Sequence, residues 1–112
     1  ENSDGEKQTE FVKELQNQFR PQPGFRAVYK IMLEGRSMPL TVRVDHTQFY
    51  CGYEEPAECD MEIQTTADTI RDIVEGKQTF QRAFMGGNMK MKGDFKILRM
   101  LDQIFPFTPN ER

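Results

Sequence analysis

The chain has 112 residues and a formal net charge of −3, and 37% of its residues are hydrophobic and 29% charged. This length allows one domain with a core of its own. The acidic balance argues against a nucleic-acid-binding protein, which usually carries a basic face. No apolar run approaches the roughly 18 residues of a membrane-spanning helix, and no stretch resembles a secretory signal.

An amphipathic helix opens the ordered part of the chain, because Phe11, Val12, Leu15 and Phe19 recur at spacings of three and four. The segment 20–24, with two prolines and a glycine, ends this helix. We expect residues 1–9 to be a frayed N-terminus, residues 10–107 to form the single domain, and residues 108–112 to be a C-terminal tail.

From Phe25 onward the apolar period changes from 3.6 to 2. The alternation predicts four strands, within residues 25–34, 40–45, 48–53 and 59–64, each with one apolar and one polar face. Such strands are typical of a sheet that is covered on one side only. The sequence therefore predicts an α+β fold of two layers, with the helices over one face of the sheet.

Two short helices are predicted to follow the fourth strand. The first is capped by Thr65 or Thr66 and ends at Gly76. The second is capped by Thr79 and ends at the pair Gly86–Gly87. Both belong to the layer that covers the sheet.

The last third of the chain carries a large apolar load. A fifth strand, residues 89–92, alternates inward methionine with outward lysine. The pair Gly93–Asp94 then turns the chain into a closing helix, residues 95–105, which Pro106 stops. Methionine suits irregular or changing shapes because its side chain is unbranched and polarizable.

The two cysteines, Cys51 and Cys59, bear on the cellular compartment. Small secreted scaffolds usually contain four or more cysteines. A hairpin centred on residues 54–56 would place the two thiols opposite each other, so a disulfide bridge stays open. Two reduced thiols are the favoured interpretation, because free cysteine is among the most buried residue types. We therefore expect a cytoplasmic protein.

Three short motifs in the second half of the chain carry a family resemblance: Gly76–Lys77, Ala83–Phe84 and Lys90-x-Lys92-Gly93. With the order of the elements, they resemble the sterol carrier protein type-two (SCP-2) family, the sterol-binding or sterol transfer domain, over roughly residues 11–107. The resemblance implies a five-stranded, mostly antiparallel sheet with helices packed on one face and an apolar tunnel between the layers. The chain is similar to the small stand-alone bacterial form, because the terminal extensions and targeting signal of the peroxisomal members are missing.

The resemblance also implies a function: non-catalytic binding and carriage of an apolar lipid, such as a fatty acid, fatty acyl-CoA, phospholipid or sterol-like molecule, without a cofactor. Composition alone favours ordinary core for the apolar stripe of the last third, whereas the resemblance favours a tunnel lining closed by a gating C-terminal helix. The residues expected to contact the ligand are Phe80, Phe84, Met85, Met89, Met91, Phe95, Leu98, Leu101, Ile104 and Phe105.

The expected partner is a hydrophobic small molecule, with a transient contact to a membrane surface or a lipid-metabolising enzyme. We expect no nucleic acid, and a monomer or a weak dimer. Six basic side chains of the last third could bind an anionic group at the mouth of a tunnel or could simply form a solvated face. The solvated face is the favoured interpretation. These side chains are Lys77, Arg82, Lys90, Lys92, Lys96 and Arg99.

Catalysis is not expected. His46 is the only histidine, and neither it nor Cys51 has a convergent acid or orienting group in the sequence. Together with Cys59 they also lack the spacing of a metal site. Two alternatives to lipid carriage stay open: a protein-interaction or dimerisation module with a filled core, and an accessory domain of a larger lipid-metabolising protein.

Overall fold

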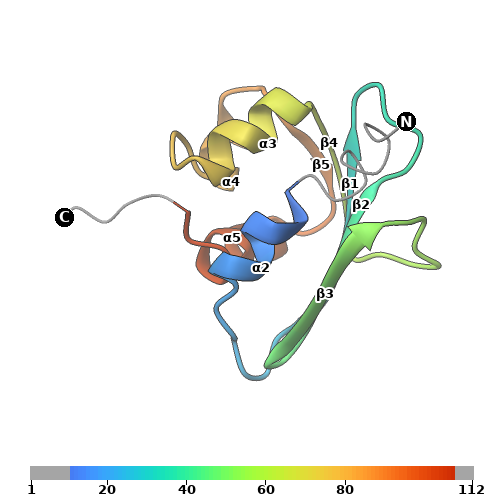
Figure 1. Cartoon of the computed structure of the whole chain (residues 1–112), viewed down its shortest axis with the longest axis vertical. Coiled ribbons are helices and arrows are strands. Elements are labelled where there is room, and N and C mark those ends of the chain that lie inside the picture. Colours follow the sequence, from blue (N-terminus) through green and yellow to red (C-terminus); the bar gives the residue numbers. More distant parts are fainter. Residues whose placement is uncertain (1–10, 108–112) are drawn as a thin grey trace.

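The computed structural model of the chain describes residues 11–107, which form two layers. One layer is a five-stranded sheet, and the helices all lie over one face of it (Figure 1). The predicted frayed N-terminus and C-terminal tail lie outside the described residues. The helices are α2 (Val12–Gln18), α3 (Ala67–Val74), α4 (Phe80–Met85) and α5 (Phe95–Ile104). The strands are β1 (Arg26–Leu33), β2 (Leu40–Asp45), β3 (Gln48–Tyr53), β4 (Met61–Thr65) and β5 (Lys90–Lys92).

The sheet is mixed, with the strand order β3-β2-β1-β4-β5. The central strand β1 pairs antiparallel with β2 and parallel with β4. The two outer pairs, β2–β3 and β4–β5, are antiparallel. The prediction of a mostly antiparallel sheet missed the parallel pair at its centre. The alternation within a strand specifies its buried face but not the strand that lies next to it.

The segment 54–60 carries the chain from β3 at one edge to the far side of β1, over the face that the helices leave open. Its carboxylates pair with outward side chains of the sheet: Glu54 with Arg43 at 3.0 Å and Glu55 with Lys30 at 2.6 Å. Because β3 and β4 are not neighbours, the hairpin considered for Cys51 and Cys59 does not form, and both cysteines are free.

The burial of the strands follows their alternation. In β1 the inward residues Ala27, Tyr29, Ile31 and Leu33 are all buried. β2 and β4 add further side chains to this face, among them Leu40, Val42, Met61 and Ile63. The two-layer α+β fold with one covered face is therefore confirmed.

The helix ends also follow the sequence signals. Thr66 caps α3 and Thr79 caps α4, each by accepting the N–H of the residue three positions later. After α3 the chain turns at Gly76 and after α4 at Gly87, with φ angles of 83° and 84°. Glycine adopts this left-handed conformation without a steric penalty, which is why it ends so many helices.

The turn between β5 and α5 requires glycine for a second reason. Gly93 has a φ of 143°, and a Cβ atom there would lie 2.9 Å from the carbonyl oxygen of Asp60. The turn therefore crosses close to the start of β4. Asp94 then caps α5, because its carboxylate accepts the N–H of Lys96 at 2.9 Å. This places the first turn of α5 at the end of the sheet where β4 begins.

Candidate functional site

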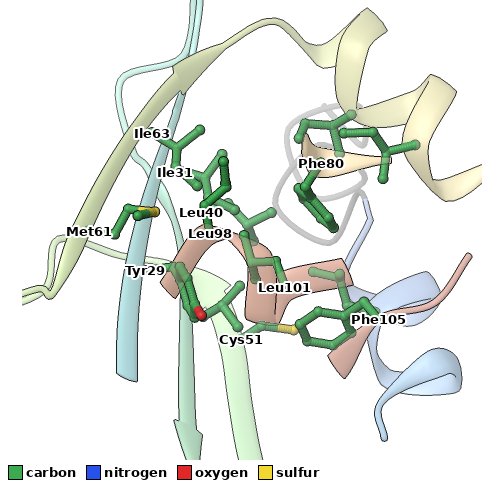
Figure 2. Close-up of a cluster of buried hydrophobic side chains, with 14 of the residues drawn as sticks. Tyr29, Ile31, Leu40, Cys51, Met61, Ile63, Phe80, Leu98, Leu101 and Phe105 are labelled. Carbon is green, nitrogen blue, oxygen red and sulfur yellow. The ribbon is translucent and has the colours of Figure 1, made fainter. Parts of the chain in front are cut away.

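The space between the sheet and the helices is filled by one apolar core (Figure 2). Leu98 and Leu101 on α5 are directed toward the side chains of the sheet, and Phe80 and Phe105 close the core on the helix side. Six of the ten predicted ligand contacts lie in this core, each at most 2% exposed: Phe80, Met89, Leu98, Leu101, Ile104 and Phe105. The structure therefore brings these six together, from α4, from α5 and from the residues directly before β5 and after α5.

The other four predicted contacts lie at the margin of the core or outside it. Phe84 and Met91 are half-buried. Met85 is 76% exposed because it is the last residue of α4, on a face that turns away from the sheet. Phe95, the first residue of α5, is 36% exposed. The structure thus corrects the predicted interior position of Met85 and Phe95.

Tyr29 joins α5 to the sheet by a hydrogen bond. Its hydroxyl donates to the carbonyl oxygen of Ile97 at 2.7 Å, from a side chain that is fully buried. Burial, followed by the negative charge of Asp60, raises the pKa of Tyr29 well above its usual value. Our sequence reasoning treated Tyr29 only as an apolar position. The signal was available, because a buried tyrosine usually needs a partner for its hydroxyl.

The C-terminal end of α5 is held by other contacts. The N–H of Arg20 donates to the carbonyl oxygen of Ile104 at 2.8 Å. The ring of Phe105 lies 5.5 Å from that of Phe49 and 6.3 Å from that of Phe107. The closing helix is therefore tied to the sheet near its start and to the segment after α2 at its end.

Asp102 of α5 caps the neighbouring helix α4. Its two carboxylate oxygens accept the N–H groups of Phe80 at 2.7 Å and of Gln81 at 3.0 Å. The hydroxyl and carbonyl oxygens of Thr79 accept the next two N–H groups of the helix. The bond from Ala83 is the first i→i−4 bond of the helix, and the N–H groups of its first three residues, which have no such partner, are thus all satisfied. Sequence reasoning missed Asp102, since nothing local to residue 102 indicates a cap for a helix that starts at residue 80.

A hollow of about 560 Å³ opens at the end of the sheet where β1 and β4 finish and β5 begins. Three of its residues face inward and are buried: Leu33, Thr65 and Met89. The hydroxyl of Thr65 donates to the carbonyl oxygen of Asn88 at 2.8 Å, which holds the loop before β5 against β4. Polar side chains stand at the rim, among them Glu34, Asn88 and Lys90. Met32, Gln64 and Lys90 also line it, and they are register partners on the outward face of the sheet, so the hollow lies beside the margin of the core and partly on the open face.

The residues weighed for catalysis do not form a reactive pair. His46 is exposed at the turn between β2 and β3, and its Nδ1 accepts the N–H of Gly24 at 3.1 Å. Cys51 is buried, and burial raises the pKa of its thiol to about 11, which keeps it protonated at neutral pH.

Within residues 11–107 no group of three or more His, Cys, Asp or Glu side chains is placed to hold a metal ion. None of the helices in these residues is long and apolar enough to cross a membrane.

Solved structures share this fold at low sequence identity. The solution structure of palmitated SCP2L2 from Aedes aegypti is 15% identical, with a TM-score of 0.61, and the match covers 98% of this chain and 97% of that one. Sterol Carrier Protein 2 from Yarrowia lipolytica, in its apo form, is 18% identical, with a TM-score of 0.53, and the match covers 97% and 84% of the two chains.

The fold also occurs inside a larger enzyme. The stereoselective inverting sec-alkylsulfatase Pisa1 from Pseudomonas sp. is 17% identical over 74% of this chain, with a TM-score of 0.64. The match covers only 13% of that chain. None of the curated protein sequences matches this chain.

The decisive comparison is with a family of sequences. The family model described as the SCP-2 sterol transfer family matches residues 12–106, which is nearly the whole of the described structure. Domains of this family bind and transfer lipids and are generally non-catalytic. The chain belongs to the SCP-2 sterol transfer family.

Proposed function

We propose that this domain binds one apolar lipid between its sheet and its helices and carries it without chemical change. The observation that supports this most is the composition of the core, where six buried apolar side chains of the last third lie together and three of them, Leu98, Leu101 and Ile104, form the buried face of α5. A lipid chain gains about 0.8 kcal/mol for each buried methylene, so a long chain gains on the order of 10 kcal/mol before ordering costs. The lipid classes that fit are a fatty acid, a fatty acyl-CoA, a phospholipid or a sterol-like molecule.

In this proposal the polar end of the lipid lies in the hollow at the start of β5. The volume of the hollow, about 560 Å³, falls in the usual range of ligand pockets, roughly 300–1,000 Å³. Asn88 and Lys90 stand at its rim and offer donors to a carboxylate or phosphate. The apolar chain runs from Met89 into the core. It displaces the contacts between α5 and the sheet, and methionine side chains adapt to the new shape.

The test is to extract the purified protein with organic solvent and identify what is released by mass spectrometry, with native mass spectrometry to give the stoichiometry. We expect one lipid per chain. We also expect uptake of a fluorescent fatty acid, weakened about tenfold by Met89→Trp because the larger ring fills the junction of hollow and core. Tyr50→Trp is the control, since Tyr50 is 50% exposed and lies on β3, the edge of the sheet opposite to β5.

A protein that releases no lipid and takes up no fatty acid would contradict this proposal. Sedimentation of that protein as a dimer would then support the alternative, an interaction module whose core is filled by its own side chains.

The movement of α5 has a separate test in Tyr29→Phe. The change removes the hydrogen bond to Ile97 and keeps the ring, so we expect a loss of about 1 kcal/mol in the free energy of unfolding. If α5 is the gate, the rate of fatty acid uptake should rise severalfold, as stopped-flow fluorescence measures. Tyr50→Phe is the control, because Tyr50 is half-exposed and its hydroxyl lies 3.5 Å from Glu54. A less stable protein with an unchanged uptake rate would show that α5 does not move.

A further inference from the structure

Three apolar side chains that do not face the interior gather where α4 ends and α5 begins. Met85 is 76% exposed and Phe95 is 36% exposed. The ring of the half-buried Phe84 lies 5.8 Å from that of Phe95, so the end of α4 and the start of α5 meet at this point. The remaining large exposed apolar side chains in the described part of the chain lie elsewhere: Met38 between β1 and β2, and Tyr50 on β3. We call Phe84, Met85 and Phe95 the apolar corner.

Basic side chains surround the apolar corner in a protein that is acidic as a whole. Residues 80–100 contain five lysines and arginines and one acidic residue, Asp94, whereas the net charge of the chain is −3. On α4, Arg82 lies three positions before Met85, so the two side chains are neighbours on the helix surface. On α5, Arg99 lies four positions after Phe95 and is its neighbour in the same way. Lys96 is exposed and lies three positions before Arg99, on the same side of α5. These three cations form a basic rim.

The side chains of the basic rim form no ion pairs within the described part of the fold. Across residues 11–107, no ion pair joins Arg82, Lys96 or Arg99 to a carboxylate. The nearest acid in sequence, Asp94, accepts the backbone N–H of Lys96 and so caps α5. The rim is therefore available to an anionic partner outside the chain.

The size and shape of the apolar corner favour a lipid surface over a protein. A stable protein interface buries at least about 1,000 Å² and has a broad apolar centre, which three side chains cannot supply. Met85 instead stands at a helix end, followed by Gly87, around which there is open space. A few protruding apolar side chains with cations beside them suit the boundary between the acyl chains and the phosphates of a bilayer.

We propose that the apolar corner and the basic rim dock this domain on an anionic lipid bilayer. Met85 and Phe95 enter the boundary of the acyl chains, and Arg82, Lys96 and Arg99 lie at the phosphates. This contact does not depend on what occupies the interior, so it stands apart from the lipid carriage proposed above.

The test is flotation of the full chain with vesicles of phosphatidylcholine alone or mixed with phosphatidylglycerol. We expect the protein to float only with the anionic vesicles, and less so as salt is raised, because salt screens exposed charges. Lys96→Glu should lower the partition coefficient by about tenfold or more, since each charge near an anionic surface contributes about fivefold. Met85→Gln should lower it by roughly threefold to tenfold, through the loss of one apolar side chain.

Two matched controls separate this surface from the rest of the molecule. Lys13→Glu changes an exposed lysine that, like Lys96, is the second residue of a helix. Met38→Gln changes an exposed methionine in the turn between β1 and β2. Both should float like the wild type. Met85→Gln should also keep its uptake of fatty acid, because Met85 does not face the core.

Three results would overturn the proposal. Equal flotation with neutral and anionic vesicles would remove the role of the basic rim. Loss of flotation in Lys13→Glu but not in Lys96→Glu would move the contact to another surface. If the protein floats with neither kind of vesicle, the apolar corner does not bind a bilayer, and an acidic protein becomes the expected partner of this surface. None of these results bears on whether a lipid is extracted from the purified protein, so the two proposals fail separately.

Discussion

Replacing Leu101 by Asp is expected to unfold the domain and to abolish lipid uptake with it. Leu101 is 1% exposed and lies in the middle of α5, above the side chains of the sheet (Figure 2). The change leaves a cavity and puts an unpaired carboxylate into an apolar core, a loss of about 5 kcal/mol or more. Domains of this size are stable by about 5–15 kcal/mol in all. Urea unfolding followed by circular dichroism measures the loss.

The control for this change is Gln103→Asp, which introduces the same carboxylate on the exposed face of the same helix. We expect it to cost about 1 kcal/mol or less, through repulsion from the C-terminal end of the helix dipole. A folded Leu101→Asp protein that still takes up fatty acid would show that α5 is not the cover of the lipid site.

Replacing Asp102 by Ala is expected to cost about 2–4 kcal/mol in the free energy of unfolding. The carboxylate accepts two backbone N–H groups of α4, and hydrogen bonds to a charged group contribute about 1.5–3 kcal/mol each. α4 has only six residues, too few to be a stable helix without outside contacts. Asp102→Asn should recover part of the loss, because an amide oxygen can still accept one of the two N–H groups.

Asp94→Ala provides the comparison for Asp102→Ala. Asp94 caps its own helix from an exposed position, and the loss of such a cap costs about 1 kcal/mol. Denaturant titration of the two variants should therefore rank Asp102 clearly above Asp94. If Asp102→Ala loses no more than Asp94→Ala, the contact between α4 and α5 does not hold the helix layer together.

The sequence predicted the local structure of this chain well. The alternation around Tyr29, Val42 and Ile63 identified the buried face of each strand, and Thr66 and Thr79 identified the helix starts, because these signals act over a few residues. The parallel neighbour of β1 was not predicted. Its pairing with β4 depends on the path of segment 54–60 across the open face, and the period of a strand carries no information about such a path.

The predicted ligand contacts show the same limit. Leu98, Leu101 and Ile104 were placed in the core by helix spacing and are found there. Met85 and Phe95 stand at helix ends, where the last or first turn decides which way a side chain points, and periodicity is weakest at those positions. The hydrogen bonds of Tyr29 and Asp102 join residues 68 and 22 positions apart, and local patterns do not report contacts at such separations.

The position of β1 has a consequence for how the sheet is made. Within residues 11–107, β1 is the first strand to be made and also the central strand of the sheet. β2 and then β3 add to one side of it, and β4 and then β5 add to the other. No strand has to enter between two strands that are already paired. The sheet can therefore grow outward in the order in which the ribosome synthesises it, with its template strand present from the start.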